Sequence, residues 1–130
     1  MRHRVAGKKL NRSYDHRKSL RRNLMCALIE HEKIQTTEAK AAAIRGELEK
    51  LITKAKRALD HEDEAREVHA RRIVLARLGN NREATNKIFD ELAPRFEDRP
   101  GGYTRRYKLG PRKGDAAPLV QIQLLSEDEG

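Results

Sequence analysis

The sequence predicts an α+β fold in which helices pack on a small mixed sheet of about three strands, preceded by an extended basic N-terminal arm. Apolar residues recur at helical spacing over residues 16–31 and 38–58. Residues 103–109 and 119–125 instead alternate in the manner of strands. Residues 1–13 show neither period and carry mostly like charge, so we expect them to be extended.

The length of 130 residues fits one domain. Charged residues make up 38% and aromatic residues 4%, without tryptophan, so the core must rest on Leu, Ile, Val and Ala and must be modest. We therefore expect an extended basic arm at residues 1–15, a single α+β domain at 16–125, and an acidic, disordered tail at 126–130.

The first helix is predicted to begin near His16 and to close at His31-Glu32. Its apolar residues recur at intervals of three and four: Leu20, Leu24, Ala27 and Leu28. Its basic residues lie mostly off that face: Arg17, Lys18, Arg21 and Arg22. The helix should thus bury one side and present a basic side outward.

A short strand and the strongest amphipathic helix come next. Residues 33–37 alternate and are rich in β-branched side chains, which favours a strand. Thr37 suits an N-cap, with Glu38 in the first turn of a helix that runs to about Ala58. Its apolar stripe consists of Ala41, Ile44, Leu48, Leu51, Ile52, Ala55 and Leu59.

Two weaker helices and a strand pair complete the predicted domain. Residues 64–78 are helical by composition, but their apolar residues do not follow a regular helical spacing. Asn81 can cap the next helix, and Pro94 limits the continuation of that helix. In the segment 103–109, one face carries Tyr103, Arg105, Tyr107 and Leu109, and the other carries Thr104, Arg106 and Lys108. In the last strand, Val120, Ile122 and Leu124 should face inward.

Positive charge is gathered in two segments. Residues 1–22 carry nine basic residues and one acid, and residues 99–113 carry six basic residues and no acid. The whole chain carries +9 and these two segments together +14, so the other residues carry a net −5. Such an arrangement favours contact with a polyanion at both segments and leaves the helical middle mildly acidic.

These segments supply the candidate RNA-binding residues. Lys and Arg neutralise phosphates and release counterions, and the planar fork of Arg grips a phosphate with two hydrogen bonds. Tyr103 and Tyr107 could stack on bases or pack in the sheet, and packing is the commoner use of such residues. The predicted residues are Arg2, His3, Arg4, Lys8, Lys9, Arg12, His16, Arg17, Lys18, Arg21, Arg22, Arg99, Tyr103, Arg105, Arg106, Lys108, Arg112 and Lys113.

Other classes of function fit less well. The cluster at 61–64 has metal-binding residue types without a recognised ligand spacing, and Cys26 lies on or beside an apolar helix face, as a small core residue would. We expect no enzyme activity, no metal and no cofactor. A nucleoid-type DNA-binding protein and an RNA-processing enzyme are the alternatives, but the acidic helical middle argues against a recognition helix. No apolar run suits a membrane span or a secretory signal, so we expect a cytoplasmic location, although an organellar origin stays open.

Several motifs resemble one family. They are Met-Arg-His-Arg at 1–4, Lys9-Leu10-Asn11-Arg12, Ile34-Gln35-Thr36-Thr37, Gly101-Gly102-Tyr103-Thr104-Arg105 and Gly114-Asp115-Ala116-Ala117-Pro118. Together they resemble the bacterial large-subunit ribosomal protein L-seventeen family, over about residues 1–59 and 80–125. The resemblance implies a two-layer α+β fold and a structural role in the large ribosomal subunit, where the protein would bind 23S ribosomal RNA near the outer region of the exit tunnel. It also implies the large-subunit protein L-thirty-two as a neighbour.

Overall fold

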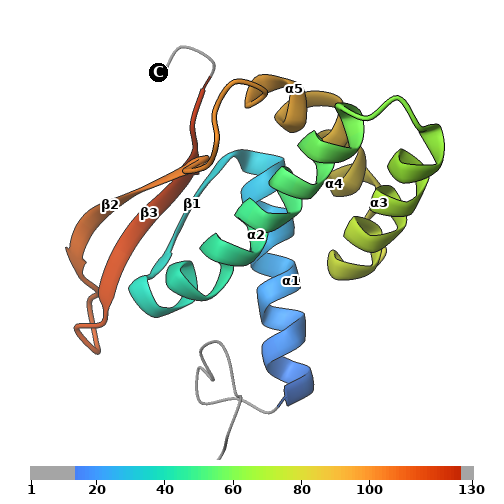
Figure 1. Ribbon diagram of the computed structural model, residues 1–130. Coiled ribbons are helices and arrows are strands. Elements are labelled where there is room, and N and C mark those ends of the chain that lie inside the picture. The colour runs from blue at the N-terminus through green and yellow to red at the C-terminus, as the bar shows by residue number, and fades with distance from the viewer. Residues whose placement is uncertain (1–13, 127–130) are drawn as a thin grey trace, which may run out of the picture.

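The computed structural model describes residues 14–126. Most of the predicted arm and acidic tail therefore lies outside the described residues. Figure 1 shows the order of the elements along the chain. They are α1 (Tyr14–His31), β1 (Lys33–Thr37), α2 (Glu38–Leu59), α3 (Glu64–Arg77), α4 (Arg82–Lys87), the π-helical turn η1 (Ile88–Leu92), α5 (Ala93–Arg95), β2 (Thr104–Pro111) and β3 (Pro118–Leu124).

The three strands form one sheet in the order β1-β3-β2, and the predicted α+β class is confirmed. The expectation of a mixed sheet is wrong in one respect, because both pairings are antiparallel. The short connection between β2 and β3 makes a hairpin, whose strands must be antiparallel. Strand β1, far away in sequence, pairs with the other edge of β3, with Ile34 opposite Ile122. A central β3 thus joins the two ends of the domain.

Helices cover one face of this sheet, and α2 lies across the middle of the molecule (Figure 1). The predicted apolar stripe of α2 is confirmed at Ile44, Leu48 and Ile52, which are fully buried. From the sheet side, Val120 and Ile122 are buried as predicted. One hydrophobic cluster includes residues from α1, α2, α3 and the sheet, so the described residues share a single core.

Local signals at the helix starts predicted the boundaries well. The side chain of Thr37 accepts a hydrogen bond from the Lys40 amide at 3.4 Å, and Asn81 accepts one from the Ala84 amide at 3.0 Å. Both caps satisfy amides that have no partner within the helix. Helix α1 begins at Tyr14, two residues earlier than predicted, with Asp15 in its first turn where the helix dipole favours an acid. The domain thus takes in the last two residues of the predicted arm.

The segment before Pro94 departs from a simple helix. The chain passes from α4 through the π-helical turn η1 into the short α5, which ends at Arg95. Proline has no amide hydrogen for the usual bond to residue i−4, and a widened turn just before it accommodates this loss. The turn buries Ile88, Phe89 and Leu92 against the core. None of the helices within residues 14–126 is long and apolar enough to cross a membrane.

Glu32 joins the end of α1 to the distant α4 and α5. Its φ is 63°, in the left-handed region that side chains disfavour, where the chain turns from α1 into β1. Arg95 donates to both oxygens of its carboxylate, and Lys87 Nζ lies 3.1 Å from Oε2. The hydrogen bond from Arg95, followed by the one from Lys87, lowers the pKa of Glu32 to about 2. The ionised carboxylate therefore stabilises the fold.

We expect Glu32→Gln to lower the free energy of unfolding by about 1 kcal/mol near neutral pH, a value that allows for solvent screening of a side chain about one third exposed. The folded-state pKa lies below the unfolded one, so this stabilisation is present above about pH 4.5 and is lost as the pH falls towards about 2. Urea unfolding across this range measures it. The exposed Glu30→Gln is the matched control, and an equal deficit of the Glu32 variant at all pH values would contradict the ionic explanation.

Candidate RNA-binding surface

The β2–β3 hairpin carries the most accessible of the predicted cations. Every residue of β2 after Thr104 is exposed, because β2 is an edge strand and pairs only with β3 among the described residues. Arg105 and Tyr107 lie on one face, and Arg106 and Lys108 lie on the face shared with Val120 and Ile122, as the alternation predicted. Within residues 14–126, Arg105, Arg106, Lys108 and Lys113 form no ion pair. The hairpin thus offers four uncompensated positive charges.

The tip of the hairpin has a defined shape. Gly110 interrupts the register of β2 and β3 with a φ of 98°, and Gly114 has a φ of 101°. Both angles lie in the region that glycine adopts without strain. The Arg112 amide donates to the Ala117 carbonyl at 2.7 Å, which closes the loop. The loop therefore holds its cations on an ordered backbone.

Arg112 differs from the other predicted cations of the hairpin because it has an internal partner. Its Nε donates to Asp115 Oδ1 at 3.0 Å, and its Nη2 pairs with Oδ2. These bonds, with one from the Ala117 amide to Asp115, hold the pKa of Asp115 well below its usual range. Asp115 lies just past the segment in which the sequence shows no acid, and it neutralises much of the charge predicted for Arg112. We assign Arg112 chiefly to shaping the loop.

Tyr103 anchors the base of the hairpin and is not a base-stacking residue, which corrects its place among the predicted RNA contacts. Its side chain is fully buried, with its ring centroid 5.0 Å from that of Phe96. The hydroxyl accepts a hydrogen bond from Lys56 Nζ at 3.1 Å and lies 3.0 Å from Thr53 Oγ1, to which it can donate. Of the two alternatives for the tyrosines, Tyr103 packs. Tyr107 is 43% exposed.

A second bond fixes the start of β2 to α2. Thr104 donates to Glu49 Oε2 at 2.6 Å, and Lys56 Nζ also donates to the Arg99 carbonyl. Arg99 itself is half-buried, so its side chain is less accessible than predicted. Through these contacts α2 determines the direction in which the hairpin leaves the domain.

The predicted cations of α1 divide into two groups. Arg21 lies 3.8 Å from Glu47, and Arg22 Nη2 donates to the Ala76 carbonyl at 3.5 Å, so both contact other helices. His16 and Lys18 are exposed, and Arg17 is half-buried. The remaining predicted contacts lie outside the described residues: Arg2, His3, Arg4, Lys8, Lys9 and Arg12.

The residue types that first suggested other chemistry have structural roles. Asp63, in the acidic cluster, caps α3 by accepting from the Ala65 amide at 2.9 Å. Across the described chain, residues 14–126, no group of three or more His, Cys, Asp or Glu could hold a metal ion. Cys26 packs partly against the core as expected, and burial raises the pKa of its thiol, which disfavours the reactive thiolate.

Sequence reasoning overlooked a set of basic residues on α2 and α3. Lys50, Lys54 and Arg57 follow the helical spacing of one face, and Arg66 and His69 follow it on α3. That spacing was available in the sequence, but the net negative charge of the helical middle obscured it. These five side chains line one groove.

Comparisons with known proteins agree with the resemblance of the sequence motifs. The model of the family described as ribosomal protein L17 matches residues 20–125. The chain is 52% identical over 125 residues to the large ribosomal subunit protein bL17 of Chloroflexus aurantiacus, covering 96% of this chain and 100% of that one. It is 48% identical over 132 residues to bL17 of Thermotoga maritima, covering 100% of both. From the match over most of its length and these identities, we conclude that the chain belongs to the ribosomal protein L17 family.

Proposed function

We propose that the chain is a structural constituent of the large ribosomal subunit in the cytoplasm, and that it binds and stabilises 23S ribosomal RNA. The similar proteins carry the name of a large-subunit protein, which supports the first part. The RNA contacts are assigned to the basic N-terminal segment, to Lys18 with its neighbours on α1, and to the hairpin. In this role the protein acts by holding RNA and needs no catalytic group.

The observation that carries the proposal is the hairpin, where three exposed cations on an anchored edge strand and a fourth, Lys113, in its loop form no ion pair among residues 14–126. A duplex or folded RNA presents closely spaced phosphates, and rows of cations two residues apart on a strand can follow such a backbone. Tyr107 adds an exposed aromatic ring between these cations. A free nucleoid-type DNA-binding protein fits less well, because the similar proteins are named as proteins of the large ribosomal subunit.

The N-terminal segment is tested by its removal. Deletion of residues 1–13 leaves α1 intact and removes five basic residues from the chain: Arg2, Arg4, Lys8, Lys9 and Arg12. The slope of the logarithm of RNA affinity against the logarithm of salt concentration should then fall in magnitude by about 3 to 5. Titration of protein-free 23S ribosomal RNA at several salt concentrations measures it. An unchanged slope would exclude this segment as an RNA contact.

We also propose the large-subunit protein L-thirty-two as a neighbour in the particle, on the family resemblance alone. Chemical cross-linking of assembled large subunits, followed by identification of the linked peptides, tests it. If the two proteins repeatedly failed to cross-link while other neighbours did, this protein would be rejected as a neighbour.

A further inference from the structure

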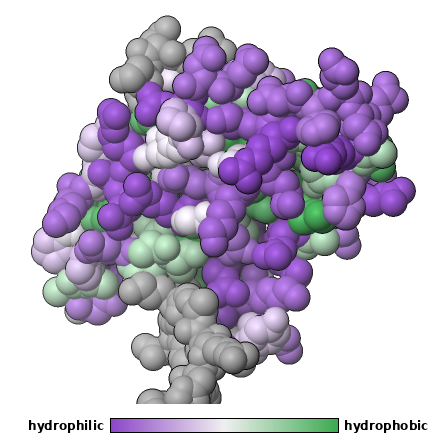
Figure 2. Space-filling model, viewed as in Figure 1, coloured by the Kyte–Doolittle hydropathy of each residue, from purple (hydrophilic) through white to green (hydrophobic). Residues whose placement is uncertain are grey.

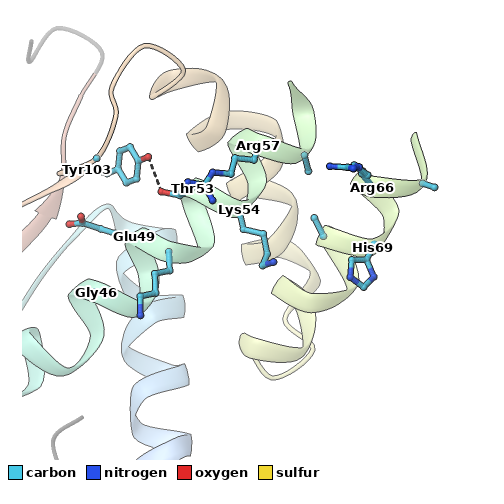
Figure 3. A pocket seen from close by; sticks show the side chains of 13 residues that line it. Gly46, Glu49, Thr53, Lys54, Arg57, Arg66, His69 and Tyr103 are labelled. Carbon is cyan, nitrogen blue, oxygen red and sulfur yellow. Dashed lines mark hydrogen bonds between the residues drawn. The ribbon is translucent and has the colours of Figure 1, made fainter. Parts of the chain in front are cut away.

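A groove of about 840 Å³ is lined by residues of α2, α3 and the segment before β2, and several of them are basic (Figure 3). The cations are Lys50, Lys54, Arg57 and Arg66, and His69 lies beside them. In Figure 3, Lys54 from α2 and Arg66 from α3 point towards the space between the two helices. Cationic side chains from two helices therefore line one groove.

Three of the five acids on α2 and α3 already have other partners, and Glu49 is the single acid among the described residues that line the groove. Glu47 pairs with Arg21, Glu49 with Arg45 and Thr104, and Glu67 with Arg71. Within residues 14–126, Lys50, Lys54, Arg57 and Arg66 form no ion pair. The helical middle thus has a net negative charge, but its surface at the groove is positive.

The shape of the groove suits a backbone better than a side chain. Its lining contains the small residues Ala58, Ala65 and Ala70, and an added Cβ at Gly46 or Gly101 would meet no atom within 4 Å. Gly46 lies within α2, where glycine weakens a helix by about 1 kcal/mol relative to alanine. Small residues allow close approach of a polymer that carries its charge on its backbone.

The same features favour RNA over an acidic peptide as the occupant. A docked peptide helix would bury large apolar side chains, yet among residues 14–126 Tyr103 is the only large hydrophobic residue that lines the groove, and its hydroxyl is bonded to α2. Hydrophilic residues dominate the surface on the side of α2 and α3 that Figure 2 shows. Lys and Arg without apolar anchors are typical of contacts with phosphates.

We propose that the groove between α2 and α3 binds a stretch of RNA phosphate backbone, as a contact separate from the hairpin and the N-terminal segment. This inference rests on the proposed function and adds a third surface to it. Lys54, Arg57 and Arg66 neutralise phosphates along the groove, and His69 and Lys50 extend the row at its edge. The helical middle then faces RNA as well.

The test compares two full-length variants that lose the same charge. The groove variant is Lys54→Gln, Arg57→Gln and Arg66→Gln. The control variant is Lys33→Gln, Arg72→Gln and Arg82→Gln, whose residues are also exposed and lie outside the groove and the hairpin. Binding to protein-free 23S ribosomal RNA should show a salt slope smaller in magnitude by about 2 to 3 for the groove variant and nearly unchanged for the control. Thermal unfolding verifies that both variants fold.

A second measurement uses the unmodified chain. Lys50 and Lys54 should react several-fold more slowly with a lysine-acetylating reagent when 23S ribosomal RNA is bound, whereas Lys33 should react at an unchanged rate. Equal salt slopes for the two variants, with no protection of Lys54, would overturn the proposal. So would a groove variant that binds RNA normally but fails to enter large subunits, because the occupant would then be a protein. Since the hairpin cations are intact in both variants, failure here leaves the proposed function standing.

Discussion

Replacing Arg105, Arg106, Lys108 and Lys113 by Gln is expected to weaken binding to 23S ribosomal RNA by on the order of a hundredfold or more at physiological salt, and to reduce the magnitude of the salt slope by about 3. The reason is the loss of four phosphate contacts, each of which releases counterions on binding. All four side chains are exposed and form no ion pair within residues 14–126, so the fold should be retained. Titrations over a range of salt concentrations, with circular dichroism of the free variant, measure both effects.

The control for this variant is Arg112→Gln, because Arg112 is already paired with Asp115. This single change should reduce the free energy of RNA binding by less than one quarter of the loss caused by the fourfold variant. It should also loosen the hairpin loop. If the fourfold variant kept its affinity and slope, the hairpin would not be an RNA contact, and the proposed function would lose its main support.

Replacing Tyr103 by Ala is expected to lower the free energy of unfolding by about 3 to 5 kcal/mol, because it leaves a cavity beside Phe96 and removes the partner of Lys56 and Thr53. Tyr103→Phe keeps the ring and should cost about 1 to 2 kcal/mol, through the lost hydrogen bonds of a buried hydroxyl. Chemical denaturation of each variant gives both values.

Tyr107→Ala provides the matched comparison, since Tyr107 lies on the same strand and is 43% exposed. Its removal should change the free energy of unfolding by less than about 1 kcal/mol. If the two alanine variants were equally destabilised, Tyr103 would not be the anchor of the hairpin base.

Local features of the fold were accessible from the sequence. The alternation of Val120, Ile122 and Leu124 predicted their inward face, and Thr37 and Asn81 predicted two helix starts. These signals depend on neighbours a few residues away, so the sequence displays them directly. The sequence did not show that the sheet is wholly antiparallel, because β1 and its partner β3 are separated along the chain by all the helices after α1.

The sequence predicted the candidate site in outline. The errors in that prediction share one cause. Arg21 has its partner Glu47 on another helix, and Arg22 bonds the Ala76 carbonyl far along the chain. A count of charges cannot show which are already neutralised by such distant groups. The same limitation hid the groove, where acids that balance the total charge of the helices are bonded elsewhere.

The outer edge of β2 has a consequence for the free protein. An edge strand presents unpaired amide and carbonyl groups that can recruit another chain and begin aggregation. Here that edge is dense in Arg and Lys, whose mutual repulsion keeps two molecules from aligning. The charges proposed to hold RNA would therefore also protect newly made protein from self-association until it is incorporated into a particle.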